Sequence, residues 1–295
     1  MKSLRLVALA LGILLVVACM PKAIPPPAPP PPRPAKVALV LGAGASRGFA
    51  HVGVLKVLDA QKVPIHLIVG TSSGSFVGSL YACGFDGFQL QKMALAIQKD
   101  DVVDLTIPDN GFVRGEKLEN YVNRAVQNCT LERLKTPFLA VATNVQTGEE
   151  TVFAMGNTGK AVRASCSIPG IFQPVRIGEK TYMDGGVVSP VAVDAARKAG
   201  ADVVIAVDIS VGVAGATPQG TLETILQSID IMYTKISAAQ LRNADVVIRP
   251  RVNHIATSDF DKRHEAILEG EKAAAEALPR IQAILDKFRK EGRLP

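Results

Sequence analysis

The segment that decides the fold is IHLIVGTSSGSFVGS, residues 65–79. Its first five residues are short, mostly apolar and rich in β-branched side chains, which predicts a buried strand. A G-x-S-x-G pattern follows at residues 70–74, and the stretch from Ser73 to Cys83 contains no proline, so a helix can begin at once. Strand, sharp turn and helix together predict a nucleophile elbow with Ser72 at the helix head, where the helix dipole favours negative charge. An ordinary helix cap is the alternative, because glycine and serine are common in turns.

The rest of the chain alternates between strand and helix patterns. Upstream, Val37–Leu41 predicts a strand, residues 42–48 predict a loop, and Gly48–Gln61 predicts a helix. Downstream, helical patterns cover residues 88–98, 115–126, 159–167, 191–198, 222–241 and 261–290, and strand patterns cover residues 137–144, 151–154, 174–177, 181–183, 201–209 and 245–248. Pro279 is expected to break or restart the last helix, because proline has no backbone N–H. This alternation predicts one α/β domain with parallel strands and right-handed crossovers.

Composition and cysteine usage limit the classes of function. The chain has 295 residues, 48% hydrophobic and 20% charged, which is enough for one large domain or two small ones. Its net charge of +6 is spread along the sequence and it has no tryptophan, which disfavours nucleic-acid binding and leaves contact with anionic lipid open. Cys83, Cys129 and Cys166 follow the leader in an odd number, so complete pairing is precluded and buried free thiols are expected. They lack metal-ligand spacing, and no metal or cofactor is expected.

The N-terminus has the pattern of a lipoprotein leader. Residues 1–18 have a basic start and an apolar run, which predicts a signal peptide. The residues VVAC at 16–19 resemble a bacterial lipobox, in which Cys19 is diacylated; an ordinary signal peptide with an incidental cysteine is the alternative. Residues 19–35 then form a lipidated, proline-rich linker that extends roughly 40 Å as polyproline II. We expect a membrane-anchored protein of the cell envelope, in the outer membrane if the cell is Gram-negative, because no aspartate follows Cys19.

A serine nucleophile needs a base, and the sequence offers few candidates. Of the four histidines, His51 and His66 lie in predicted core elements, and a Ser-His-Asp triad built on His254 stays open. Asp184 follows a predicted strand and precedes two glycines, so a tight turn would hold its carboxylate partly desolvated, with a raised pKa. Within hydrogen-bond reach of Ser72, such a carboxylate can take the hydroxyl proton itself. The alternative is that Asp-Gly-Gly is only a turn.

The glycine loop at residues 42–48 supplies a candidate anion site. Successive backbone N–H groups in a small-residue loop form a concave site for a phosphate or for a developing oxyanion. The loop is not a G-x-G-x-x-G fingerprint, no P-loop lysine follows it, and Val69-Gly70 stands where a dinucleotide site would have an acidic residue. A dinucleotide site is therefore disfavoured.

Four segments carry a resemblance to a known family. They read GAGASRGFAHVGVLKVLD, IVGTSSGSFVGSLYACG, ASCSIPGIFQPV and YMDGGVVSPV, between residues 37 and 193. This text resembles the patatin-like phospholipases, especially bacterial single-domain members and the catalytic domain of neuropathy target esterase. The resemblance implies a three-layer α/β domain over residues 36–295, with a mostly parallel central sheet and helices on both faces.

The resemblance also implies a chemistry. It implies a Ser-Asp dyad, with Ser72 as nucleophile and Asp184 as base, that cleaves acyl esters of phospholipids or lysophospholipids through an acyl-enzyme, without metal or cofactor. A catalytically silent envelope protein that binds lipid or protein with the same fold is the first alternative. A nucleotide-binding protein that uses the glycine loop is the second.

The resemblance assigns the oxyanion hole less sharply than the dyad. It implies that Gly44 and Ala45 donate N–H groups to the oxyanion and that Arg47 anchors the loop or adds positive charge. Alanine stands at positions 43 and 45, where the family commonly has glycine, and a positive φ at Ala45 would strain the loop. The region from Asp100 to Tyr121 is expected to cover the acyl pocket.

Overall fold

The computed structural model describes residues 32–107, 110–210 and 217–295. Contacts within the chain separate a first unit, Met1–Arg33, from a second unit, Pro34–Pro295, and the fold described below is that of the second unit. The predicted signal peptide, Cys19 and most of the predicted linker lie outside the described residues. Within the described ranges, no helix combines the length and the apolar character that crossing a bilayer requires.

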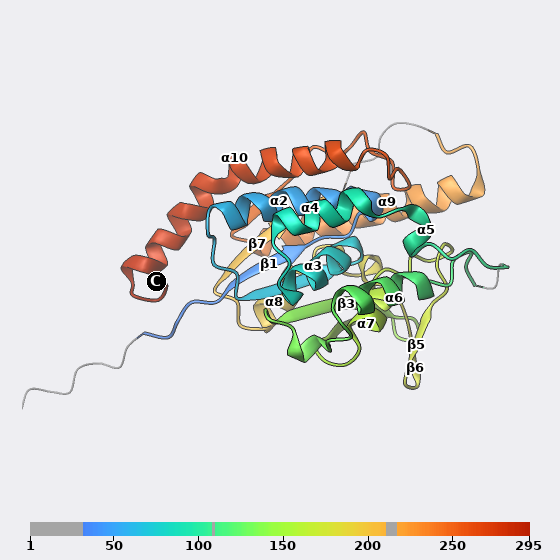
Figure 1. Ribbon diagram of the computed structural model, residues 1–295, viewed down its shortest axis with the longest axis horizontal. Coiled ribbons are helices and arrows are strands. Elements are labelled where there is room, and N and C mark those ends of the chain that lie inside the picture. The colour runs from blue at the N-terminus through green and yellow to red at the C-terminus, as the bar shows by residue number, and fades with distance from the viewer. Residues whose placement is uncertain (1–31, 108–109, 211–216) are drawn as a thin grey trace, which may run out of the picture. The chain divides into compact units, whose positions relative to one another are not determined.

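One sheet forms the middle of the domain (Figure 1). Its strands are β1 Val37–Leu41, β2 Leu67–Thr71, β3 Phe138–Asn144, β4 Glu150–Phe153, β5 Val175–Ile177, β6 Lys180–Asp184, β7 Val203–Val207 and β8 Val246–Ile248. Followed from one hydrogen-bonded neighbour to the next, the strands form the path β5-β6-β3-β2-β1-β7-β8, and β4 also pairs with β3. The pairs among β3, β2, β1, β7 and β8 are parallel, and β4, β5 and β6 add antiparallel pairs at one end. The prediction of a mostly parallel sheet is confirmed.

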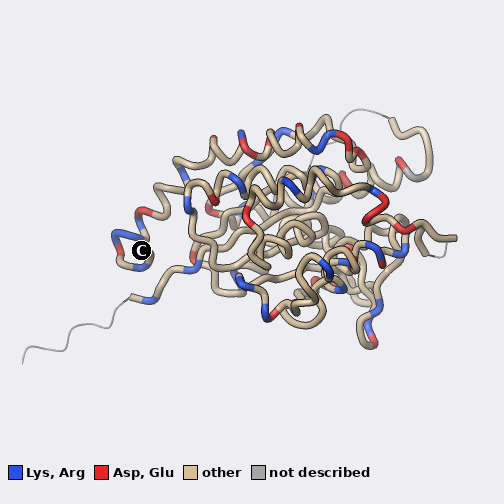
Figure 2. Tube along the Cα trace, in the orientation of Figure 1, with Lys and Arg blue, Asp and Glu red and all other residues tan. Residues whose placement is uncertain are grey.

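Helices cover both faces of this sheet. They are α2 Phe49–Ala60, α3 Ser73–Cys83, α4 Gly87–Ala96, α5 Lys99–Val102, α6 Glu116–Ala125, α7 Thr158–Ser165, α8 Val193–Lys198, α9 Thr221–Gln240 and α10 Arg263–Lys290. Successive residues of β1 point to opposite faces, so Leu39 joins the apolar core under α2, α3 and α10, whereas Val40 joins the core under α8. The three-layer architecture is therefore confirmed, and Figure 2 shows charged residues of both signs interspersed along the chain around it.

Three local predictions need correction. Helix α10 continues through Pro279, because the buried Ile281 and Leu285 beyond it pack into the core and offset the lost hydrogen bond. Strand β2 begins after His66, whose exposed ring accepts a hydrogen bond from the Val37 N–H through Nδ1 at 3.1 Å. The stretch after α4, to which the sequence patterns assigned neither helix nor strand, contains the short helix α5.

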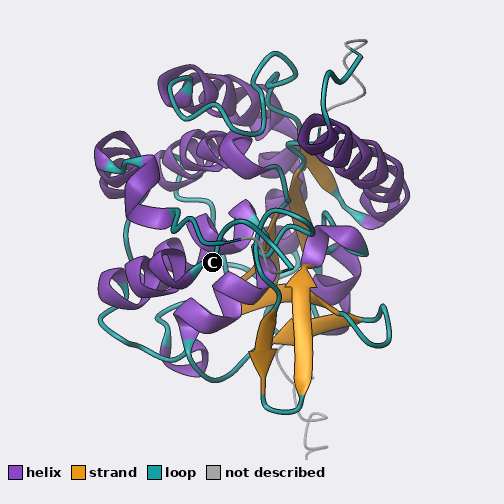
Figure 3. Ribbon diagram, turned by 90° about the vertical axis from the view of Figure 1, so that its right-hand side faces the viewer, coloured by secondary structure: helices purple, strands orange, loops and turns teal. Residues whose placement is uncertain are grey.

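The pairing of β3 positions the candidate site. At Ala140 and Val141, β3 pairs with β2 and β4 together, and at Ala142 and Thr143 it pairs with β4 and β6. Because β4 occupies one edge throughout, β2 and β6 must share the other edge, end to end. They run in opposite directions there, so the carboxyl ends of both strands meet. Figure 3 shows the sheet and its helices from the side at which these strand ends lie.

Candidate active site

Ser72 lies in a strained turn between β2 and α3. Its φ of +53° and ψ of −124° are unfavourable for a residue with a side chain. A Cβ added to Gly70 would lie 2.5 Å from the Cα of Ser75, and one added to Gly74 would lie 2.0 Å from the carbonyl oxygen of Leu41. Only glycine fits at both positions, so the G-x-S-x-G pattern forms a strained strand-to-helix turn of the kind expected for a nucleophile elbow.

The structure brings Ser72 and Asp184 together. The Ser72 hydroxyl donates a hydrogen bond to Asp184 Oδ2 at 2.6 Å, and both side chains are buried. The sheet explains this contact, because Thr71 pairs with Val141 and Asp184 pairs with the next residue of β3, Ala142. Ser72 directly follows Thr71, so the two side chains lie next to one another along one edge of β3, although 112 positions separate them in sequence.

Two further donors hold the other carboxylate oxygen of Asp184. The Gly186 N–H donates to Oδ1 at 2.7 Å, and the Tyr233 hydroxyl donates to the same atom at 2.9 Å. Burial raises the pKa of Asp184 to about 6, and hydrogen bonds from Ser72, Gly186 and Tyr233 oppose that rise. Burial also raises the pKa of Tyr233, so its hydroxyl stays protonated. Oδ2 therefore remains directed at Ser72, on a carboxylate that is ionised at neutral pH.

The glycine loop lies beside the serine with two unused donors. The N–H groups of Gly42 and Ala43 donate to the carbonyls of Val207 and Pro190 at 3.0 and 2.8 Å. The N–H groups of Gly44 and Ala45 make no hydrogen bond within the described part of the chain. Ala45 has a φ of +50°, the strained conformation considered from the sequence, and lines the same cavity as Ser72. The loop therefore holds two backbone N–H groups that have no acceptor in the described part of the chain, and one of them belongs to a residue, Ala45, that lines the cavity together with Ser72.

Arg47 anchors the loop and does not face the cavity. Its buried guanidinium donates from Nη2 to both carboxylate oxygens of Asp230 on α9, at 2.9 and 2.8 Å. Arg47 is absent from the lining of the cavity, whereas Ala45 and Ser46 belong to it. Of the two roles considered from the sequence, the geometry favours the anchor.

The histidines do not complete a triad. His51 is buried and donates a hydrogen bond from Nε2 to the Gly42 carbonyl at 2.8 Å, and burial lowers its pKa to about 4. It is therefore neutral at physiological pH and ties the glycine loop to α2. His254 contacts Glu265 at 2.6 Å and lies away from the cavity that Ser72 lines, so the triad alternative is wrong.

An apolar cavity of about 390 Å³ extends from Ser72. Its lining includes Phe76 and Leu80 of α3, Leu90 and Met93 of α4, and Leu118 of α6. A cavity of this size and apolar character suits a hydrocarbon chain better than a polar metabolite. Part of the region from Asp100 to Tyr121 lines it too, as the sequence led us to expect, through side chains such as Val102 and Val113.

The family model for the patatin-like phospholipases matches residues 39–197, more than half of the chain. The chain belongs to the patatin-like phospholipase family. Membership places it among the hydrolases.

Two curated relatives illustrate this patatin-like similarity. Lysophospholipase NTE1 of Coccidioides immitis (strain RS) is 29% identical over 292 residues, which cover 88% of this chain and 18% of that protein. An NTE family protein of Mycobacterium tuberculosis (strain ATCC 25618 / H37Rv) is 31% identical over 273 residues, covering 83% of this chain and 46% of the relative. The chain therefore spans less than half the length of each relative.

A solved structure supports the patatin-like fold. VipD from Legionella pneumophila superimposes with a TM-score of 0.61, covering 84% of this chain and 67% of the VipD chain at 13% identity. At this identity the likeness concerns the fold alone.

Three residues at this site were given no role in the sequence analysis, although one of them, Ser165, lies in the quoted segment at residues 164–175. Ser165 at the end of α7 accepts the Ser72 N–H at 2.9 Å and donates to the Val141 carbonyl at 2.6 Å, which ties the elbow to β3. Asp230 and Tyr233 lie one helical turn apart on α9 and contact Arg47 and Asp184 respectively. Nothing in the periodicity of α9 distinguishes them from ordinary core and surface residues.

The remaining predictions from the sequence concern the cysteines and metal binding. Cys83, Cys129 and Cys166 are free thiols, but only Cys166 is buried; the other two are partly exposed, which corrects the expectation for them. Over the described ranges, no group of three or more His, Cys, Asp or Glu side chains is arranged to hold a metal ion.

Proposed function

We propose that this patatin-like chain is a serine acyl hydrolase that cleaves phospholipids or lysophospholipids through a Ser72–Asp184 dyad. The observation that carries the proposal is the 2.6 Å hydrogen bond from Ser72 Oγ to Asp184 Oδ2 beside an apolar cavity. Family membership supports hydrolysis of phospholipid at the coarser level. The dyad, the acyl-enzyme and the choice between one-chain and two-chain lipids belong to the proposal.

The first half-reaction forms an acyl-enzyme. Ser72 Oγ attacks the ester carbonyl carbon while its proton passes to Asp184 Oδ2. The N–H groups of Gly44 and Ala45 stabilise the resulting oxyanion, a role for which each donor typically contributes ~2.7–4 kcal/mol. When the tetrahedral intermediate collapses, the C–O bond to the leaving alcohol breaks and that oxygen takes the proton from Asp184.

The second half-reaction releases the fatty acid. Water attacks the acyl carbonyl carbon and gives a proton to Asp184, which returns it to Ser72 Oγ as the acyl bond breaks. A base with a pKa of about 6 suits both directions of transfer near neutral pH. The acyl chain occupies the apolar cavity throughout.

Substitution of each dyad member tests this mechanism directly. Ser72→Ala and Asp184→Asn should each abolish turnover of a short-chain acyl ester and labelling by a fluorophosphonate probe. Ser79→Ala is the matched control, because Ser79 is a buried serine of α3 whose hydroxyl donates to the Phe76 carbonyl of the same helix. Full turnover in both dyad variants would show that the dyad is wrong. Lipid binding without turnover or labelling in the unaltered protein would favour the catalytically silent alternative.

Membrane attachment through Cys19 is a separate part of the proposal. It rests on the lipobox-like residues 16–19 and the apolar run before them. Two or three acyl chains on one residue suffice for stable anchoring, and the tether would keep the domain near its lipid substrate in the cell envelope. Incorporation of labelled palmitate that disappears in Cys19→Ala would support the anchor, and unchanged incorporation would exclude it.

A further inference from the structure

Three large apolar side chains are exposed on one short segment beside the cavity. Leu105, Ile107 and Phe112 have 80%, 87% and 49% of their surface exposed. Leu105 and Phe112 also line the cavity that contains Ser72, so they must lie at its opening. In Figure 1 the backbone that carries them extends beyond α5 and α6. Exposed apolar side chains concentrated in this way mark a surface for a partner or a membrane.

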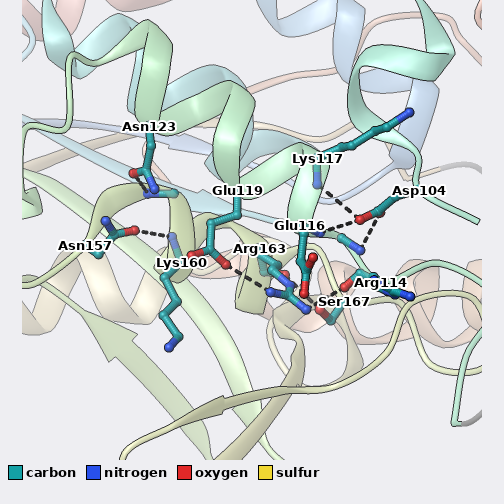
Figure 4. Close-up of polar contacts among 12 residues, drawn as sticks. Asp104, Arg114, Glu116, Lys117, Glu119, Asn123, Asn157, Lys160, Arg163 and Ser167 are labelled. Carbon is teal, nitrogen blue, oxygen red and sulfur yellow. Dashed lines mark hydrogen bonds and ion pairs between the residues drawn. The ribbon is translucent and has the colours of Figure 1, made fainter. Parts of the chain in front are cut away.

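The backbone that presents these side chains is anchored. The Thr106 N–H donates to the Phe112 carbonyl, and the Phe112 N–H donates to the Ile171 carbonyl, both at 2.9 Å. Figure 4 shows Asp104 at the base of the segment, where its carboxylate accepts the N–H groups of Gly115 and Glu116 at 2.7 and 2.9 Å. Asp104 thereby caps α6 from outside the helix. The apolar side chains are therefore held outward by a fixed base.

The charged side chains around Asp104 do not form a surface patch of one sign. Lys117 donates from Nζ to the Asp100 carbonyl at 2.8 Å. Arg163 pairs with Glu119 at 3.0 Å (Figure 4). Side chains of both signs occur on α5 and α6, Arg114 adds a positive charge between Phe112 and α6, and Asp104 is engaged in the cap. A partner held here must be attracted by apolar surface and not by net charge.

We propose that Leu105, Ile107 and Phe112 form a docking rim that inserts into a lipid surface and aligns the cavity with the acyl chains of that surface. The choice of lipid rests on the proposed function. Under a bilayer the cavity opening faces hydrocarbon, whereas a second copy of the chain or another folded protein seated on the rim would cover the opening. Because the charges near the rim are of both signs, binding needs no net charge on the lipid surface. A membrane of zwitterionic phosphatidylcholine should therefore be enough for the rim to insert.

A single tryptophan can report insertion at the rim, because the chain has none of its own. Phe112→Trp places the fluorophore on the rim, and Phe88→Trp is the matched control at an aromatic position that is 64% exposed and lies outside the cavity lining. Both are made in the full chain with Ser72→Ala, so that no lipid is consumed. The emission reports the labelled position only, so the apolar leader does not contribute to it.

With phosphatidylcholine vesicles, emission of the Phe112→Trp protein should shift to the blue and be quenched by brominated acyl chains. The Phe88→Trp protein should show neither effect. Equal responses at both positions, or none at position 112, would overturn the rim. A blue shift that depends on protein concentration without vesicles would identify a second copy of the chain as the occupant.

Turnover gives a second readout with active protein. Ile107 does not line the cavity, so Ile107→Ser should leave kcat/KM for a monomeric short-chain ester unchanged. It should raise KM for phospholipid in vesicles about tenfold, as expected when one large apolar side chain no longer enters the membrane. An unchanged vesicle KM would count against the rim. Loss of all ester turnover in the unaltered protein would refute the proposed function instead, and the fluorescence result would stand apart from it.

Discussion

Replacing Tyr233 with phenylalanine would remove one of three hydrogen bonds that stabilise the ionised form of Asp184. The Tyr233 hydroxyl donates to Oδ1 at 2.9 Å from α9, and phenylalanine keeps the ring that packs there. The dyad contact itself is to Oδ2, so the substitution leaves Ser72 and its acceptor in place. The expected effect is a change in the pKa of the base, with the fold preserved.

The size of that change follows from the hydrogen bond. A hydrogen bond to a charged group contributes about 1.5–3 kcal/mol, and 1.36 kcal/mol corresponds to one pKa unit. The pKa of Asp184 should therefore rise from about 6 to about 7–8. The acidic limb of kcat/KM should move upward by the same interval. At pH 7 activity should fall about two- to tenfold, and at pH 9 most of it should return.

The assay is the pH dependence of kcat/KM with a water-soluble acyl ester. The other titratable group near Asp184 is the buried Cys166 thiol, whose pKa is raised by burial and which stays protonated over this range. Asp230 on α9 acts on Tyr233 by charge and is unchanged in the variant. Tyr182→Phe is the matched control, because Tyr182 is a buried tyrosine of β6 whose ring packs on Phe153.

Two outcomes would contradict this role of Tyr233. If Tyr233→Phe lowers kcat/KM equally at every pH, the hydroxyl does not set the pKa of the base. If Tyr182→Phe moves the acidic limb as far as Tyr233→Phe does, the shift reflects loosened packing. Either outcome removes Tyr233 as the residue that positions and tunes Asp184.

Three further variants test other parts of the site. Asp184→Asn removes a carboxyl whose folded pKa of about 6 lies above its ordinary value of 3.8, so its stabilisation is complete below about pH 4 and lost as the pH rises through 6. By urea denaturation the variant should therefore gain about 1–3 kcal/mol over wild type at pH 8 and nothing below pH 4; equal stability at pH 8 would contradict this. Gly74→Ala should lose about 3 kcal/mol, because its Cβ would lie 2.0 Å from the Leu41 carbonyl oxygen, and a wild-type thermal transition would exclude the clash. Asp230→Ala should lose about 3 kcal/mol by leaving the buried Arg47 guanidinium unpaired, and full stability would show that the ion pair does not anchor the loop.

Local sequence patterns predicted most elements of this fold. Alternating apolar runs and helical periodicity located the strands and the longer helices to within a few residues, because burial of one face imposes those periods on the chain. Pro279 shows the limit of such rules. Its missing N–H predicts a break, yet the side chains beyond it find enough core to continue the helix.

In the candidate site, too, some residues have a signal in the local sequence and others do not. The glycines around Ser72 and the glycines after Asp184 are local signals, because each permits a backbone approach that any side chain would block. Tyr233 and Asp230 have no local signal, since their roles depend on where α9 lies against the loop and the base. The sequence left two roles open for Arg47, anchoring the loop or adding positive charge. Its contact with Asp230 on α9 favours the anchor.

Neighbouring residues alone indicated that the chain alternates strand and helix, that Ser72 follows one strand in a sharp turn and that Asp184 ends another. These are properties of neighbouring residues, so short-range sterics and hydrophobic periodicity are enough to read them. Only the tertiary structure decided that the two residues meet. Strands β2 and β6 share one edge of β3 and run in opposite directions, which places the two strand ends at adjacent pairing positions, Val141 and Ala142. That register arises from packing between segments 112 positions apart, and no local pattern encodes it.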